Sequence, residues 1–166
     1  MNVLIVYATN SSGTLTASEI VERVLAAAGF SVMRKSADTI SPAEIGEYDA
    51  VVFGSCTWNV TIKDRVAEGQ LQQHFRKLET NMKGMSFPNV KFAVFGLGDS
   101  SYTNFCAAAD HLVGLVSRLQ GIKVGETLKL DEFYFHLAEN SKRVEEWTKS
   151  IAKEFQKQTV AQSAVA

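Results

Sequence analysis

The sequence contains few cysteines and prolines, and it has no long apolar run. There are 2 cysteines and 2 prolines among 166 residues. Two cysteines are too few for a disulfide framework, and such usage is typical of a protein from the reducing cytoplasm. The first apolar stretch begins at residue 2 without a basic leader, so we expect no secretory signal and a cytoplasmic location. Apolar runs such as 50–53 are far shorter than the roughly 20 residues of a membrane-spanning helix, so we expect no membrane segment.

An excess of charge of either sign is also absent. The chain has 17 basic and 18 acidic residues, a formal net charge of −1, and no long block of like charges. Proteins that bind nucleic acid or anionic membranes usually carry a basic patch, so we expect neither partner. The three histidines, His74, His111 and His136, show no metal-ligand spacing, and we interpret them as structural residues.

The hydrophobic fraction of 46% and the length of 166 residues suit one globular domain. No internal repeat or proline-rich linker marks a boundary. We therefore expect a single domain over residues 1–155, followed by a frayed tail over 156–166 in which the helical periodicity is lost.

Strand-like and helix-like segments alternate along the chain. Runs rich in valine, isoleucine and phenylalanine predict strands at 2–7, 31–34, 50–54, 91–96 and 123–130. The segments between them carry helical periodicity, and continuous apolar strands are typical of a sheet covered on both faces. The pattern predicts a three-layer, doubly wound α/β fold with a five-stranded parallel sheet.

Three segments between these elements are less regular. Residues 41–48 are too few for more than a turn or two of helix. The next helix is expected to bury Leu71 together with Phe75 and Leu78, which share one helical face. The polar stretch 60–69 shows no clear period and is predicted to be a loop.

The loop after the first strand has the composition of a phosphate-binding loop. It precedes a helix, where free backbone N–H groups and the helix dipole favour an anion. It lacks the lysine of a Walker A loop, and a serine and threonine cluster in this position is also explained as a helix N-cap. The residues are Thr9, Asn10, Ser11, Ser12, Gly13 and Thr14.

Two further loops follow strands of the same sheet, at residues 55–60 and 98–102. Ligands of doubly wound sheets bind at the carboxyl ends of the strands, where these loops lie. The loops carry Trp58 and Tyr102, each of which taken singly is explained as a core plug or a surface anchor. Together with the phosphate-binding loop they suit a ligand with a phosphate at one end and a flat ring at the other, such as flavin mononucleotide (FMN).

Residues 2–155 resemble a short-chain flavodoxin. In the first loop Thr9, Ser11 and Thr14 match the family motif, whereas Ser12 occupies its usual glycine position and Gly13 follows one residue later. We therefore expect either a redistributed turn or an unfavourable backbone conformation at Ser12. The third loop is the most specific match, and it comprises residues 95–102 with Phe105 and Cys106 beyond. The resemblance implies a flavodoxin-like fold with strand order 2-1-3-4-5.

The resemblance also implies roles around a bound FMN ring. Trp58 and Tyr102 are expected to sandwich the isoalloxazine, and Thr57 to lie beside the ribityl chain and the ring. Backbone N–H groups in the loop of Gly98 and Asp99, and near Cys106, are expected to reach the pyrimidine oxygen. Asp99 also suits an Asx turn, which is compatible with that role.

Asn59 and Cys56 complete the implied set. Asn59 occupies the position whose peptide turns over when the flavin is reduced, so that its carbonyl accepts a hydrogen bond from flavin N5. Cys56 lies where many relatives carry a hydroxyl near the phosphate, and its alternative interpretation is a small buried apolar residue. We expect no disulfide between Cys56 and Cys106.

The resemblance implies a monomeric, low-potential one-electron carrier that shuttles between a reductase and an acceptor protein and has no substrate of its own. An FMN-dependent quinone or NAD(P)H reductase of related fold is the alternative, and a flavin-free signalling module is a third possibility. Lys63 and Arg65 are expected either to raise the lower flavin potential or to contact an acidic patch on a partner, unless they are only solvated loop charges.

Overall fold

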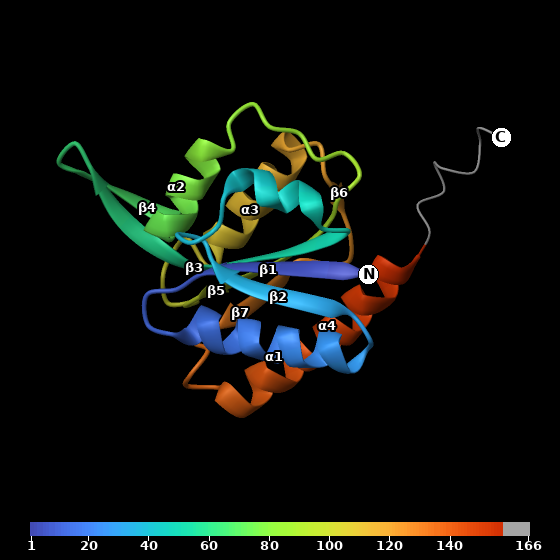
Figure 1. The fold of residues 1–166 in the computed structure, drawn as a ribbon. Helices are drawn as coiled ribbons and strands as arrows, with labels where there is room; N and C mark the ends of the chain where they lie inside the picture. Colours follow the sequence, from blue (N-terminus) through green and yellow to red (C-terminus); the bar gives the residue numbers. More distant parts are fainter. Residues whose placement is uncertain (158–166) are drawn as a thin grey trace.

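The structure is a computed structural model, and it describes residues 1–157. A parallel sheet forms the middle layer, with helices packed on both of its faces (Figure 1). The elements follow one another as β1 (Asn2–Ala8), α1 (Gly13–Ala27), β2 (Ser31–Ser36), the 3-10 helix η1 (Pro42–Glu47), β3 (Ala50–Ile62), β4 (Arg65–Leu71), α2 (Gln73–Asn81), β5 (Lys91–Gly98), α3 (Ala107–Arg118), β6 (Ile122–Lys123), β7 (Leu128–Asp131) and α4 (Leu137–Gln156).

The predicted strand order is confirmed. The sheet runs β2-β1-β3-β5-β6, with every neighbouring pair along this path parallel. The predicted fifth strand, 123–130, is divided into β6 and β7, and both pair with β5. Gly125, at φ 63°, lies between them and allows the chain to turn there.

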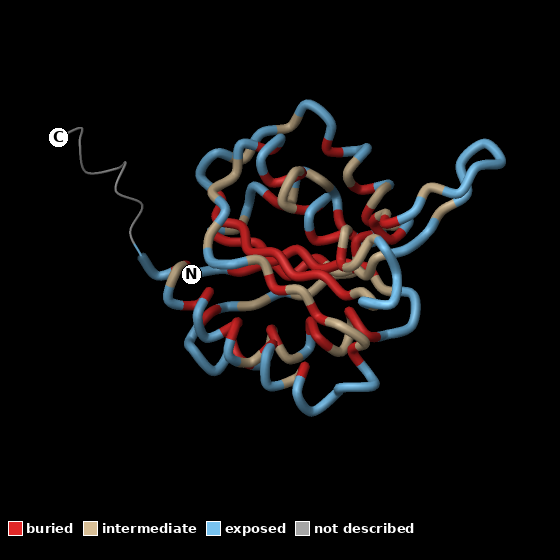
Figure 2. The backbone as a smooth tube through the Cα atoms, turned by 180° about the vertical axis from the view of Figure 1, so that it is seen from behind, coloured by how far each residue is buried: buried red, intermediate tan, exposed pale blue. Residues whose placement is uncertain are grey.

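Two apolar clusters pack on opposite faces of the sheet. The backbone coloured by burial shows the buried residues concentrated in the strands of the sheet (Figure 2). Because side chains alternate along a strand, Leu4 and Val6 belong to the cluster under α2 and α3, whereas Val3 and Ile5 belong to the cluster under α1 and α4. All four side chains are fully buried. The continuous apolar strands seen in the sequence therefore have the cause that was predicted, burial on both faces.

The prediction of a loop over 60–69 is wrong. β3 continues to Ile62 and forms an antiparallel hairpin with β4, and this hairpin projects beyond the carboxyl edge of the sheet (Figure 1). Lys63 and Asp64 connect the strands with φ angles of 48° and 62°, and positive φ at both central residues is what a type I′ hairpin turn requires. The charged residues at the tip, Lys63, Asp64 and Arg65, interrupt the alternation of apolar and polar residues by which a strand is recognised in the sequence.

Smaller differences concern the helices. The segment 41–48 forms the 3-10 helix η1, consistent with its short length. Leu71 ends β4 instead of starting a helix, because Gln72 caps α2 with its side chain, which accepts a hydrogen bond from His74 N. α4 includes Gln156, the first residue of the expected tail, and residues 158–166 lie outside the described part of the chain.

Lys91 is a nearly buried cation at the start of β5. Its side chain is 8% exposed, and its ammonium group donates to the carbonyls of Phe155, at 2.8 Å, and of Lys157 at the end of α4. A cation at this position satisfies the last carbonyls of the helix and complements its dipole. Lys91 thus connects the sheet to the last turn of α4.

We expect Lys91→Met to lower the free energy of unfolding by about 1 to 2 kcal/mol, because the aliphatic stem is kept but the donors are lost. Urea unfolding measures this change. Lys123→Met, at an exposed position on β6, is the matched control and is expected to change stability by less than about 0.5 kcal/mol. Equal effects of the two substitutions would contradict the capping role.

Candidate functional site

A cavity of about 630 Å³ lies at the carboxyl edge of the sheet, within the range of small-molecule binding sites. The loops after β1, β5 and β7 meet around it, together with the part of β3 that continues into the hairpin and the base of β4. The segment 55–60, predicted to be a loop, is thus a continuation of β3, because it pairs with β4. Of the residues predicted for the site, the cavity is lined by Thr9, Asn10, Ser11, Gly13, Thr14, Cys56, Thr57, Trp58, Asn59, Gly98, Asp99 and Tyr102. The side chains of Ser12, Phe105 and Cys106 are not among its walls.

The first loop resolves the question raised by its displaced glycine. Ser12 is the N-cap of α1 and adopts the left-handed conformation, with φ 65° and ψ −3°. Gly13 is buried, and a Cβ atom there would lie 2.9 Å from Leu97 Cδ2. Gly13 therefore serves close packing against β5, and Ser12 takes the unfavourable turn that a glycine would adopt more easily.

We expect Ser12→Gly to raise the free energy of unfolding by about 0.5 to 1 kcal/mol, because glycine adopts a positive φ without steric cost. Urea unfolding tests this. Ser11→Gly is the control, since Ser11 is not among the residues with positive φ and gains nothing from a glycine. A loss of stability in Ser12→Gly as large as that in Ser11→Gly would show that the conformation carries no strain.

Two hydroxyl groups in this loop have no hydrogen-bond partner although they are buried. They are Thr9 Oγ1 and Thr14 Oγ1, and both residues line the cavity. Such a group costs about 1 to 3 kcal/mol if it stays unsatisfied. Because Thr14 also lies in the first turn of α1, where backbone N–H groups are free, the two hydroxyls suit the oxygens of a bound anion.

Cys56 lines the same end of the cavity and is half-buried. Burial raises the pKa of its thiol, and the backbone N–H of Asn10 opposes this shift in part. The thiol therefore stays protonated at neutral pH. A protonated and weakly polar side chain in the cavity wall agrees with the interpretation of Cys56 as a small apolar residue.

The two predicted aromatic residues are exposed side chains that line the cavity. Trp58, in the hairpin part of β3, is 53% exposed, and Tyr102, in the loop after β5, is 66% exposed. Thr57 Oγ1 accepts a hydrogen bond of 3.2 Å from Ala108 N, which connects β3 to the first turn of α3. Large aromatic rings exposed beside a cavity are available to stack on a planar ligand.

Hydrogen bonds hold the loop after β5 in place. Asp99 Oδ1 accepts from Ser101 N at 2.8 Å, which forms the Asx turn considered for this residue. Asp131, at the end of β7, accepts from Ser100 N at 2.8 Å, and hydrogen bonds from Ser100 lower the pKa of the Asp131 carboxyl. The loop that carries Tyr102 is thus anchored to the neighbouring strand.

Cys106 lies beneath this loop, not in the cavity. It is fully buried, caps α3 with φ 50°, and its Sγ lies 3.4 Å from the Leu130 carbonyl oxygen. Burial raises the pKa of this thiol to about 12. A Cβ atom on Gly98 would lie only 2.6 Å from Cys106 N, so close packing requires the glycine. Phe105 is half-buried beside it.

The base of the hairpin contributes residues that sequence reasoning missed. Glu68 and Gly69 line the cavity, and Asn59 Oδ1 accepts from Gly69 N at 3.1 Å. Glu68 also accepts from Asn104 Nδ2 at 3.2 Å, so β4 connects the strand that carries Trp58 to the loop that carries Tyr102. Asn59 lies within β3 and does not have the positive φ of a turn residue. These contacts were missed because 60–69 was interpreted as a loop.

The loop after β7 adds three consecutive aromatic residues to the wall, Phe133, Tyr134 and Phe135. Phe135 is 87% exposed, and the Tyr134 hydroxyl lies 3.2 Å from Thr16 Oγ1 in α1. A run of aromatic residues directly after the fifth strand, at the edge where the other loops lie, is a signal that could have identified this wall from the sequence.

The histidines and a second cavity lie outside the functional arrangement. His111 Nε2 is 3.0 Å from the Gly69 carbonyl oxygen, and among residues 1–157 no group of side chains has the composition of a metal site.

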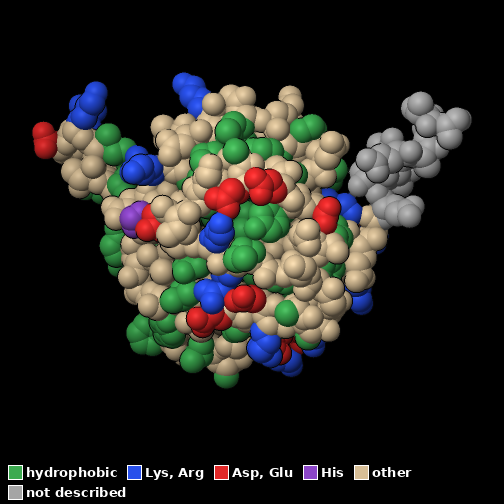
Figure 3. All heavy atoms as spheres, viewed as in Figure 1, with side chains coloured by type: hydrophobic (Ala, Val, Ile, Leu, Met, Phe, Trp, Pro, Cys, Tyr) green, Lys and Arg blue, Asp and Glu red, His purple; other side chains and the backbone are tan. Residues whose placement is uncertain are grey.

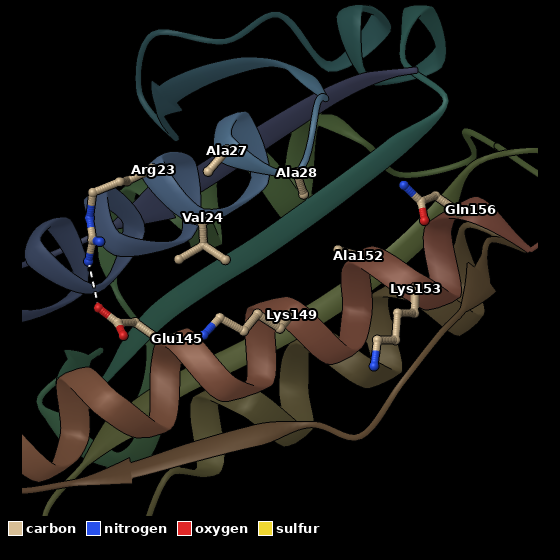
Figure 4. A pocket seen from close by; sticks show the side chains of 9 residues that line it. All are labelled: Arg23, Val24, Ala27, Ala28, Glu145, Lys149, Ala152, Lys153 and Gln156. Carbon is tan, nitrogen blue, oxygen red and sulfur yellow. Dashed lines mark hydrogen bonds and ion pairs between the residues drawn. The ribbon is translucent and has the colours of Figure 1, made fainter.

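A second cavity, of about 540 Å³, lies between α1 and α4 and shares no residue with the first (Figure 4). Arg23 and Glu145 form an ion pair of 2.7 Å across it. Within the described residues, no helix is both long and apolar enough to span a bilayer.

Comparison with known proteins identifies relatives of this architecture. A family model described as Flavodoxin matches residues 5–147. The flavodoxin of Maridesulfovibrio salexigens is 33% identical over 129 residues, which cover 77% of this chain and 84% of that protein. The flavodoxin of Nitratidesulfovibrio vulgaris is 36% identical over 131 residues, which cover 78% and 84%.

Solved structures show the same fold at lower identity. The oxidised flavodoxin 1 of Bacillus cereus matches with a TM-score of 0.79 and 20% identity, covering 92% of this chain and 98% of that chain. The Fusobacterium nucleatum flavodoxin bound to flavin mononucleotide matches with a TM-score of 0.78 and 20% identity, covering 93% and 99%.

Proposed function

This chain belongs to the flavodoxin family, and we propose that residues 1–155 form one FMN-binding unit that carries single electrons between a reductase and a low-potential acceptor protein. Flavodoxins bind FMN and are electron-transfer proteins rather than enzymes. The observation that supports the proposal is that one cavity is lined both by two residues with unsatisfied buried hydroxyls and by two exposed aromatic residues.

The residues present fit the two ends of FMN. The hydroxyls of Thr9 and Thr14, together with free N–H groups of the first turn of α1, would hold the phosphate. Trp58 and Tyr102 would stack on the isoalloxazine and shield it from water. When bound, FMN supplies the redox chemistry by accepting and releasing electrons one at a time. The exposed rims of both rings leave an edge of the site open to a partner.

An anaerobic redox titration of the purified protein loaded with FMN tests the proposal. We expect a yellow protein, two separate one-electron steps, and no oxidation of NAD(P)H unless a reductase is added. Direct NAD(P)H or quinone turnover would instead support the alternative, a reductase of related fold. Failure to bind FMN would exclude both. We further propose that the protein acts as a monomer in the cytoplasm, where its two free thiols stay reduced.

The hairpin tip is the proposed contact with an acidic partner. Lys63 is the first residue of the hairpin turn and Arg65 is the first residue of β4, and neither is among the residues that line the cavity. Basic and acidic side chains both occur on this projection (Figure 3). Because the hairpin extends away from the body of the protein, the two cations are better placed to meet a partner than to change the flavin potentials.

We expect the double variant Lys63→Glu, Arg65→Glu to slow electron transfer to an acidic iron–sulfur protein about tenfold at low salt, while both flavin potentials stay unchanged. Stopped-flow rates at increasing salt measure this. The variant Lys149→Glu, Lys153→Glu makes the same charge change beside the cavity between α1 and α4, and its rates are expected to change much less. Equal slowing by both double variants would indicate a net-charge effect, not a docking contact.

A further inference from the structure

Gln72 is a buried polar residue beneath the phosphate-binding loop. It is 2% exposed and lies between the end of β4 and the start of α2. Neither the sequence motifs nor the cavity lining includes it. A buried amide side chain is stable only when its donors and acceptor are paired, so its partners indicate what it does.

The two ends of the Gln72 amide group contact different parts of the protein. Oε1 accepts a hydrogen bond of 2.6 Å from His74 N and so caps α2. Nε2 donates to the Thr9 carbonyl oxygen at 3.3 Å and to Asn10 Oδ1 at 3.1 Å. The Gln72 backbone N–H donates to Ser55 Oγ at 3.1 Å. One residue therefore joins α2, β3 and the first loop.

The contact with the Thr9 carbonyl sets the direction of the following peptide group. In a trans peptide the C=O and the next N–H point in opposite directions. Because the Thr9 carbonyl accepts from Gln72, the Asn10 N–H is turned the other way, and it lies beside the Cys56 thiol in the cavity wall. The same contact keeps the segment with the unsatisfied Thr9 hydroxyl at the cavity.

We propose that Gln72 is a positioning residue for the phosphate group of the ligand, acting through the peptide of Thr9 and Asn10. This inference rests on the proposed FMN site. Gln72 Nε2 positions the first loop and Gln72 Oε1 caps α2, so a substitution that keeps only one of these atoms separates the two roles. The phosphate end of the ligand depends on this amide, whereas the ring end, held by residues of other loops, does not.

Gln72→Glu tests the assignment, because a carboxylate still accepts from His74 N but cannot donate to the first loop. Dissociation constants for FMN and for riboflavin, which lacks the phosphate, are measured by fluorescence titration. We expect about tenfold weaker FMN binding and riboflavin binding within about twofold of wild type. Gln72→Met, which removes the donors and also the cap acceptor without adding charge, is expected to shift the FMN-to-riboflavin ratio in the same direction.

Gln73→Glu is the matched control, since it makes the same change at the exposed neighbour in the first turn of α2. It is expected to leave both constants unchanged. The inference is overturned if FMN and riboflavin binding weaken by the same factor in the Gln72 variants, as a merely structural role predicts, or if neither changes. Wild-type protein that does not bind FMN would reject the proposed function itself.

Discussion

Replacing Thr14 with valine is expected to stabilise the apoprotein and to weaken FMN binding in the same variant. The Thr14 side chain is fully buried, and its hydroxyl has no partner within the described residues. Valine has nearly the same shape and removes the unsatisfied group, so we expect the free energy of unfolding to rise by about 1 to 2 kcal/mol. Urea unfolding of the FMN-free protein measures this gain.

The loss on the binding side has the same origin. A hydrogen bond to a charged group contributes about 1.5 to 3 kcal/mol, so without the Thr14 hydroxyl FMN should bind about 10- to 150-fold more weakly. Riboflavin binding should stay unchanged, because the missing contact is to the phosphate. Both effects have one cause: the buried Thr14 hydroxyl is unsatisfied in the apoprotein, and the bound phosphate satisfies it.

Thr16→Val is the matched control, two residues further along the same helix. Its hydroxyl is already paired, donating to the Ser12 carbonyl at 3.0 Å and lying 3.2 Å from the Tyr134 hydroxyl. We expect this variant to lose about 1 kcal/mol of stability. If Thr14→Val also loses stability, or if it binds FMN as tightly as wild type, the hydroxyl of Thr14 does not face the phosphate.

Removing either exposed aromatic ring is expected to produce the second large effect. Trp58→Ala and Tyr102→Ala should each weaken FMN binding by about 1 to 3 kcal/mol, the contribution of stacking a planar base on an aromatic side chain. This corresponds to about 5- to 150-fold in the dissociation constant. Because the ring and not the phosphate is affected, riboflavin binding should weaken by the same factor, in contrast to Thr14→Val.

The stability of the apoprotein separates a binding role from a structural one. Trp58 and Tyr102 are 53% and 66% exposed, so each alanine variant should unfold within about 0.5 kcal/mol of wild type. Met33→Ala, at a side chain that is 48% exposed on β2 and outside the cavity, controls for the loss of an exposed apolar group. A destabilised apoprotein with unchanged riboflavin binding would mean that the rings support the fold instead.

Much of the fold could be predicted because it depends on local patterns. Continuous apolar runs such as 50–54 and 91–96 require burial on both faces, and helical stripes between them require parallel crossovers. The hairpin could not be predicted, because its turn depends on positive φ at Lys63 and Asp64, residues whose charges suggest a loop. Propensity is a weak guide wherever a conformation is set by strand pairing.

The sequence by itself determined the alternation of strands and helices, because hydrophobic periodicity is local, and it placed the loops after parallel strands at one carboxyl edge. The order of the strands was implied by the family resemblance and not by the periodicity. Only the tertiary structure decided how that edge is arranged in detail. Gln72 meets the Thr9 carbonyl, and Gly13 packs against Leu97, through contacts between segments distant in the chain. Such contacts depend on the packing of whole elements, and no local pattern of residues encodes them.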